Sequence, residues 1–182
     1  MVLVKCAPFV PSSTQIVRLM LQLAQVGAGD VVYDLGCGDG RILFMAVEEF
    51  GAQRAVGFEI DSSLSNRLSA YIARRGLEDR VRVVHGDFFD YDLVEPTVIT
   101  LYLTDRGNSR LAPKLKGEVR PGTRIVSHYF KIPHWQPAQR VVERGLILKR
   151  TLYLYRAPDA FASEPSGEAG FLQRIERLLR PS

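Results

Sequence analysis

The chain has 182 residues, of which 46% are hydrophobic and 24% charged, and these values fit one globular domain with a full core. No apolar run reaches the roughly 18 residues that a membrane-spanning helix needs. Cys6 and Cys37 are the only cysteines, which excludes a disulfide framework and a standard zinc site and favours a cytoplasmic location.

The net charge of +4 hides an asymmetry along the chain. Residues 1–105 carry 9 Lys/Arg and 14 Asp/Glu, residues 106–156 carry 12 and 2, and residues 157–182 carry 3 and 4. The basic block of residues 106–156 suggests an anionic partner, either nucleic acid, lipid headgroups or an acidic protein face. The alternative is a solvated arginine-rich face, since only 5 of the 24 basic residues are lysine.

Hydrophobic periodicity and turn residues predict helices and strands in alternation. Ser12 and Ser13 can cap a first helix that ends before Gly27. Strands are then expected at 31–35, 54–60, 80–86, 98–103, 123–129 and 146–155, and helices at 41–50, 61–75 and 109–119, with Pro113 in or near the first turn of the last. This alternation predicts an α/β fold, a parallel sheet covered by helices on both faces.

The end of the chain has a different composition. Residues 158–167 are rich in proline, serine, alanine and glycine, which predicts a linker. Residues 168–180 form an amphipathic helical pattern, expected to dock on its own domain or to make a dimer contact. We therefore divide the chain into a domain, 1–157, and an appendage of linker and helix, 158–182.

The first strand runs into a glycine-rich turn whose residues of interest are Asp34, Gly36, Gly38, Asp39 and Gly40. Glycines let the backbone turn tightly and approach a ligand, and the N–H groups at the next helix start face that ligand. A carboxylate at Asp34 needs a partner, either a ligand ammonium or an ordered water. The dinucleotide-binding pattern needs a small residue where this chain has Arg41, so NAD is not expected.

Acidic residues also end the next two strands. Glu59 lies 25 residues after Asp34, near the ~20-residue spacing at which a carboxylate binds ribose hydroxyls, although alone it would be a cap or a surface charge. After the third strand, Asp87 can accept a hydrogen bond from an adenine amine, and Phe88 offers its N–H and an apolar wall. All three acids lie at carboxyl ends of parallel strands, where open α/β sheets bind ligands.

The glycine turn, Glu59 and Asp87-Phe88 together resemble the successive motifs of class I S-adenosylmethionine-dependent methyltransferases, over roughly residues 10–156. The resemblance implies a Rossmann-like sheet of seven strands, one of them antiparallel, and S-adenosyl-L-methionine as cofactor. It also implies that the glycine turn and Asp34 hold the methionine part, Glu59 the ribose and Asp87 the adenine.

A narrower resemblance rests on four segments, 9–13, 31–42, 57–60 and 132–135. This set is similar to the protein-lysine methyltransferases that include the broad-specificity archaeal enzyme and the mitochondrial ATP-synthase c-subunit enzyme. It implies methyl transfer to protein lysine. The tail after Pro158 departs from that family.

The acceptor side is less well defined. The fourth strand lacks the Asn/Asp-Pro-Pro-Tyr element of adenine-N6 methyltransferases, so Tyr102 is expected either to shape a lysine channel or to be a core aromatic. His128 is a second candidate for positioning the acceptor, and the channel wall is expected to include Tyr129, His134 and Trp135. An apolar channel lowers the pKa of a lysine amine, and alignment then does most of the catalysis.

Three alternatives limit this interpretation. A metal-dependent O-methyltransferase would need a second acidic pair besides Asp105 and Asn108, so no metal is expected. An RNA methyltransferase would use the basic block to hold phosphates. A non-catalytic S-adenosylmethionine-binding module would keep the glycine turn, Glu59 and Asp87 without transferring a methyl group.

Overall fold

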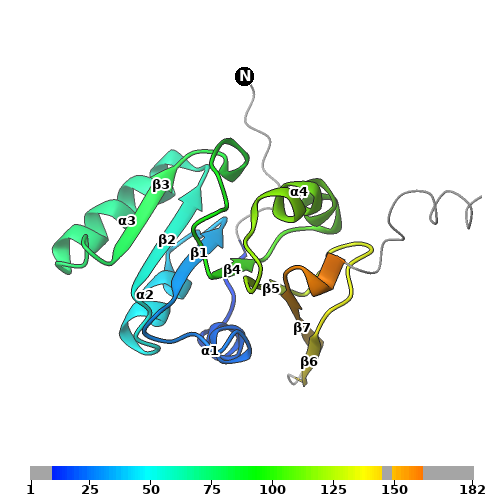
Figure 1. Ribbon diagram of the computed structural model, residues 1–182. Coiled ribbons are helices and arrows are strands. Elements are labelled where there is room, and N and C mark those ends of the chain that lie inside the picture. Colours follow the sequence, from blue (N-terminus) through cyan, green and yellow to red (C-terminus); the bar gives the residue numbers. More distant parts are fainter. Residues whose placement is uncertain (1–9, 145–148, 162–182) are drawn as a thin grey trace, which may run out of the picture.

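The strands form one sheet in the order β3-β2-β1-β4-β5-β7-β6 in the computed structural model, which describes residues 10–144 and 149–161 (Figure 1). The strands are β1 (Val31–Leu35), β2 (Arg54–Glu59), β3 (Val81–His85), β4 (Val98–Leu101), β5 (Arg124–His128), β6 (Gln139–Arg144) and β7 (Lys149–Arg156). Neighbouring strands from β3 to β5 pair in parallel, and β7 pairs antiparallel with both β5 and β6. The predicted Rossmann-like α/β class is therefore confirmed.

Helices cover both faces of this sheet. One face packs against α1 (Thr14–Leu23), α2 (Arg41–Glu48) and α3 (Ser62–Arg74). The other face packs against α4 (Asp105–Glu118) and two short 3-10 turns, η1 (Phe88–Asp90) and η2 (Asp159–Phe161). Burial on both faces explains why the central strands are almost continuously apolar, as in β1 and β4.

The predicted start of α1 is correct. The Ser13 hydroxyl accepts a hydrogen bond from the Ile16 N–H and caps the helix. The apolar positions at helical spacing form its buried face, which consists of Ile16, Val17, Met20 and Leu21. This end of α1 matters for the site, because it fixes the direction from which residues 10–12 enter the domain.

Two elements differ from the prediction. Helix α4 begins at Asp105 and not near Ser109, because the Thr104 hydroxyl caps it by accepting from the Gly107 N–H at 3.1 Å. Pro113 therefore lies inside the helix and not in its first turn, on an exposed side where water can bond the carbonyl that a proline leaves without its helical partner. Strand β6 was not expected, because as a charged edge strand it has no buried alternating face.

The sheet packing extends past the predicted domain boundary at residue 157. In η2, Ala160 is buried, its carbonyl accepts from the Gln136 N–H at 3.2 Å, and the Phe161 ring lies 4.4 Å from that of Trp135. The first residues of the expected linker thus belong to the core. The expected C-terminal helix, 168–180, lies outside the described residues.

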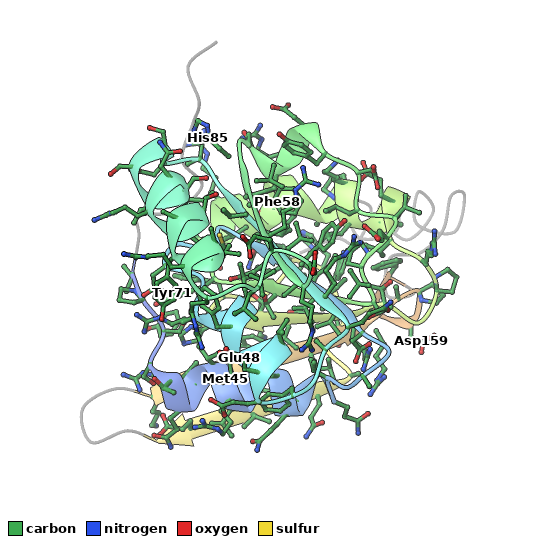
Figure 2. The ribbon with its side chains drawn as sticks, turned by 90° about the vertical axis from the view of Figure 1, so that its left-hand side faces the viewer. Met45, Glu48, Phe58, Tyr71, His85 and Asp159 are labelled. Atoms are coloured by element: carbon green, nitrogen blue, oxygen red, sulfur yellow. The ribbon has the colours of Figure 1, made fainter. Side chains whose placement is uncertain are left out.

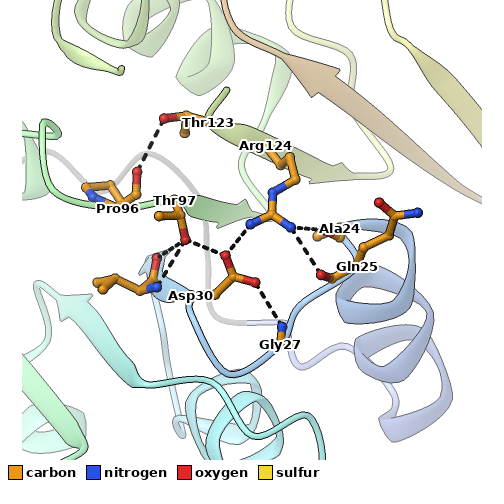
Figure 3. A network of polar contacts seen from close by, with 9 residues as sticks. Ala24, Gln25, Gly27, Asp30, Pro96, Thr97, Thr123 and Arg124 are labelled. Carbon is orange, nitrogen blue, oxygen red and sulfur yellow. Dashed lines mark hydrogen bonds and ion pairs between the residues drawn. The ribbon is translucent and has the colours of Figure 1, made fainter. Parts of the chain in front are cut away.

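A buried polar network ties the amino ends of the parallel strands together (Figure 3). The Asp30 carboxylate forms an ion pair with Arg124 at the start of β5, and it accepts from the Thr97 hydroxyl at 2.7 Å and the Gly27 N–H at 2.8 Å. Arg124 also donates to the Ala24 carbonyl at the end of α1 at 2.7 Å. One network therefore fixes α1, β1, β4 and β5 relative to one another.

We expect Arg124→Met to lower the free energy of unfolding by about 3 kcal/mol, because it leaves the Asp30 carboxylate mostly buried without its cation. Urea denaturation measures the loss. The matched control is Arg18→Met, which breaks the exposed Arg18–Glu49 pair and should change stability by less than about 1 kcal/mol. Equal losses in the two variants would show that the network around Asp30 has no special role.

The strand order fixes where a ligand can bind. The chain runs outward from β1 through β2 to β3 and then returns to β4 on the other side of β1. Helices after β1 and β4 therefore leave on opposite faces and open a crevice at the carboxyl ends of these two strands. Asp34 and Thr100 face each other across that position in the register.

Candidate functional site

The glycine turn joins β1 to α2 through backbone conformations that other residues adopt with strain. Gly36, Gly38 and Gly40 have φ of +92°, +55° and +77°. The Phe58 carbonyl on β2 accepts from both the Gly36 and Cys37 N–H groups, at 3.0 and 2.9 Å, which fixes the turn over the sheet. A Cβ at Gly40 would lie 2.6 Å from the Leu68 side chain, so this glycine also allows α2 to pack on α3.

Glu59 shapes the turn from the neighbouring strand. Its carboxylate is buried and accepts two backbone hydrogen bonds, from the Gly38 N–H at 2.9 Å and the Asp61 N–H at 2.9 Å. Asp61 then caps α3 by accepting from the N–H groups of Ser63 and Leu64. Two bonds leave acceptor capacity on the carboxylate, because each oxygen can accept twice.

Asp34 is the most perturbed acid of the site. Its carboxylate is buried and accepts a hydrogen bond from the Thr100 hydroxyl at 2.8 Å. Burial raises its pKa to about 7; the Thr100 bond opposes this increase, and the nearby charges of Glu59 and Asp39 add to it. A cation bound beside Asp34 would relieve this cost, which fits the ammonium of an amino-acid ligand.

These residues line one cleft at the crevice, with a volume of about 1000 Å³ including the solvent at its mouth. Of the predicted cofactor residues, Asp34, Gly36, Asp39, Glu59, Asp87 and Phe88 line it. Gly38 and Gly40 do not; Gly38 instead presents its N–H to Glu59, and Gly40 provides the N-cap position of α2. Figure 2 labels Phe58 of β2 and, nearer the upper edge of the view, His85 at the end of β3. Phe58 is buried and lines the cleft.

Several residues line the cleft that the sequence did not indicate as part of the site. They include Val10, Pro11, Ser12, Cys37, Arg41, Asp61, Leu64 and Leu103. Five lining residues are acidic, and Arg41 is the one basic residue among the described residues that line the cleft. Arg41 forms an ion pair with Asp39. The cleft is therefore acidic overall, although the chain carries a net positive charge.

On the acceptor side, Tyr102 is half-buried and lines the cleft. Its ring packs against that of His128, with centroids 4.1 Å apart. His128 is buried behind it and shares a 2.9 Å hydrogen bond between its Nδ1 and the Ser12 hydroxyl. Burial, and then the charge of Arg150, lower the pKa of His128 to about 4, so the ring is neutral at pH 7.

The three expected channel residues are not part of the cleft lining. Trp135 was expected in the channel wall, but its ring is buried in the core, where it packs against the rings of Tyr155 and Phe161. The reason is that the segment after β5 folds back over the sheet. Tyr129 and His134 are exposed and have positive φ, in the loop between β5 and β6. None of the three lines the cleft in the described part of the chain.

Asn108 fixes the loop between β5 and β6. It is fully buried on α4, and its side-chain amide donates to the carbonyls of Phe130 and Lys131, at 3.2 and 3.0 Å. Within residues 10–144 and 149–161, no group of three or more His, Cys, Asp and Glu is arranged to hold a metal ion. No helix in the same residues is long and apolar enough to cross a bilayer.

Comparisons with known proteins agree with this geometry. Residues 34–139 match the family described as the ANTKMT methyltransferase domain. The chain is 43% identical over 148 residues to the protein-lysine N-methyltransferase of Saccharolobus islandicus, covering 81% of this chain and 92% of that protein. It is 32% identical over 136 residues to the adenine nucleotide translocase lysine N-methyltransferase of Mus musculus, covering 75% of this chain but 58% of that protein.

Solved structures agree as well. The RNA methyltransferase from Salinibacter ruber, in complex with S-adenosyl-L-homocysteine, superimposes with a TM-score of 0.77 at 41% identity, over 82% of this chain and 95% of that one. The tRNA methyltransferase TrmK of B. subtilis has a TM-score of 0.63 at 17% identity, which shows the shared fold alone.

The cofactor of this protein is S-adenosylmethionine, and the cleft suits it. A cationic amino-acid group would offset the burial of the Asp34 carboxyl, ribose hydroxyls would use the free acceptor capacity of Glu59, and Asp87 and Phe88 line the same cleft. The match over residues 34–139 covers more than half of the chain, and the archaeal relative covers most of it. The chain therefore belongs to the ANTKMT methyltransferase family and is an S-adenosylmethionine-dependent enzyme.

Proposed function

We propose that the protein is a protein-lysine N-methyltransferase. The walls of the cleft beside Tyr102 carry this proposal, because their apolar and aromatic surface suits the aliphatic stem and the amine of a lysine side chain. The names of the Saccharolobus and mouse relatives support the same acceptor. The animal proteins are longer, since the chain spans 58% of the mouse protein and 55% of the human lysine N-methyltransferase named for the ATP synthase c-subunit.

The cleft walls supply what amine transfer needs. When bound, the cofactor supplies an electrophilic methyl group on a sulfonium. The lysine amine must lose its proton before it attacks, and the apolar walls formed by Val10, Pro11, Tyr102 and Leu103 favour the neutral amine. The neutral, buried His128 supports the Tyr102 ring from behind and is a positioning residue in this proposal. Alignment of the amine with the methyl group in this channel then provides most of the rate enhancement.

An RNA acceptor is the second candidate, favoured by the Salinibacter structure named an RNA methyltransferase. The basic block gives it little support, because its charges are spread over several parts of the fold. Arg124 is paired with Asp30 at the amino ends of the strands, away from the cleft, and Lys114 is paired with Glu118. Arg110 lies over the Phe89 ring, and Lys131 and Arg140 lie near the Tyr153 ring. This distribution supports a solvated basic surface.

One experiment distinguishes the two acceptors. The protein is incubated with S-adenosylmethionine carrying a labelled methyl group and with a lysate divided into protein and RNA fractions. We expect label in methyl-lysine after hydrolysis of the protein fraction, with Asp34→Asn protein as the inactive control. Label recovered in nucleosides, and absent from lysine, would establish the RNA acceptor instead.

We expect Tyr102→Ala to lower turnover about tenfold while the affinity for S-adenosylmethionine changes less than about twofold. The ring borders the channel, where its face stabilises the positive charge that develops on the amine nitrogen as it takes the methyl group, by about 0.5–2 kcal/mol. Tyr102→Phe keeps the ring and should keep most of the turnover. Initial rates and calorimetry measure the two effects, and a loss of cofactor affinity equal to the loss of turnover would argue that Tyr102 belongs to the cofactor site.

Two further parts of this proposal concern the whole chain. We infer one catalytic domain of residues 1–157, extended by the packed residues of η2, and a separate role for the appendage that follows. We also infer a cytoplasmic location, because Cys37 is a free, buried thiol and the low cysteine content suits a reducing compartment.

A further inference from the structure

Residues 10–12 form one wall of the cofactor cleft although they precede the first helix. Val10 and Pro11 turn apolar surface toward the cleft and are exposed, Val10 at 53%. Ser12, in contrast, is 8% exposed. The buried residue is therefore the point at which this segment is attached to the domain.

Ser12 is attached to two distant parts of the chain. Its carbonyl accepts a hydrogen bond from the Arg41 guanidinium, and its hydroxyl bonds Nδ1 of His128, 116 residues away. Arg41 itself is oriented by Asp39, whose carboxylate oxygens accept from its Nε at 2.9 and 3.1 Å. A bidentate carboxylate of this kind orients the guanidinium before Ser12 binds it.

The two attachments come from different parts of the fold, Arg41 at the start of α2 and His128 at the end of β5. Asp39 and Arg41 belong to the glycine turn, on the side where the methionine part of the cofactor would lie. His128 packs on Tyr102, which borders the acceptor side. Ser12 therefore connects the cofactor side of the cleft to the acceptor side through one residue.

We propose that Arg41 and His128 are positioning residues that hold residues 10–12, through Ser12, as a wall of the cofactor cleft, and that this wall sets the rate at which S-adenosylhomocysteine leaves. The physical reason is that a segment outside regular structure has few bonds of its own, so loss of one attachment frees it from the cleft. The neutral His128 ring and the Arg41–Asp39 pair keep both attachments formed at neutral pH.

The test measures the affinity and the dissociation rate of S-adenosylhomocysteine with Ser12→Ala and with Arg41→Gln, by calorimetry and by displacement of labelled compound. Loss of one hydrogen bond of about 1 kcal/mol predicts roughly fivefold faster dissociation and fivefold weaker affinity for each variant. The matched control is Arg54→Gln, which breaks the exposed Arg54–Glu95 pair at the other end of β2 and should leave both values unchanged.

A double-mutant cycle tests the role of His128. His128→Phe keeps a ring against Tyr102 and removes the nitrogen that bonds Ser12, so it should match Ser12→Ala, and the two changes together should add nothing more. Unchanged dissociation in both Ser12→Ala and Arg41→Gln overturns the proposal. So does a lower melting temperature of the cofactor-free protein with cofactor affinity unchanged, because that result would make the contacts purely structural.

Discussion

Asp34→Asn is expected to abolish cofactor binding and, at the same time, to stabilise the cofactor-free protein above pH 7. Both effects follow from one buried carboxyl. Asparagine keeps the oxygen that accepts from the Thr100 hydroxyl, so the variant retains the local bond, but it removes the negative charge that a cationic ligand needs. A folded variant that binds no cofactor separates the charge of Asp34 from any role in folding.

The effect on stability follows from proton binding. The pKa of Asp34 is about 7 in the folded protein and near 3.8 in the unfolded chain. At a pH between these two pKa values, the Asp34 carboxyl holds a proton in the folded state and has released it in the unfolded state. The free energy of unfolding therefore falls as the pH rises from about 4 to 7. In this range the free energy of unfolding should fall by about 1.4 kcal/mol per pH unit because of this group, and this contribution should be absent in Asp34→Asn.

Affinity for S-adenosylmethionine should depend on pH in the opposite direction. Only the ionised carboxylate attracts the cation, so the affinity should fall about tenfold between pH 8 and pH 6. Calorimetry across this range, together with urea unfolding of wild type and Asp34→Asn, measures both effects. An affinity that is flat from pH 5 to pH 8 would contradict the assignment of Asp34 to the cationic part of the cofactor.

The sequence predicts the central part of the fold and the acids of the cleft well, for local reasons. A strand buried on both faces is a short apolar run, and β1, β2 and β4 all have this pattern. Because the carboxyl ends of parallel strands lie at one edge, Asp34, Glu59 and Asp87 were expected to meet, and they line the same cleft.

What the sequence does not predict depends on contacts between distant residues. Trp135 follows β5 and suggests an acceptor channel, but η2 supplies Phe161 to cover its ring, and no local pattern indicates that contact. Ser12 has the pattern of a helix cap, whereas its bonds to Arg41 and His128 join segments far apart in the chain. Gly40 suggests close approach to a ligand, but its neighbours are Leu68 and Phe44 of the packed helices.

Glu59→Ala is expected to weaken S-adenosylmethionine binding by about 100-fold. Glu59 accepts from the N–H groups of Gly38 and Asp61, and it has acceptor capacity left for ribose hydroxyls. Alanine removes the bonds that the carboxylate would accept from the two ribose hydroxyls. It also leaves the buried Gly38 N–H without its acceptor, which weakens the turn in the free and the bound protein alike. Two lost hydrogen bonds to a charged group, at about 1.5 kcal/mol each, correspond to about 100-fold.

A graded series tests which contacts matter. Glu59→Gln keeps one accepting oxygen but places an NH₂ group where the second backbone N–H donates, so its loss should be intermediate, about tenfold. Glu95→Gln is the matched control, since Glu95 accepts from the Tyr33 hydroxyl and Arg54 away from the cleft. Calorimetry gives the affinities, and thermal melting of the cofactor-free proteins shows how far the turn itself is disturbed. If Glu59→Ala melts lower than wild type but binds the cofactor equally well, Glu59 only holds the turn and makes no contact with the ribose.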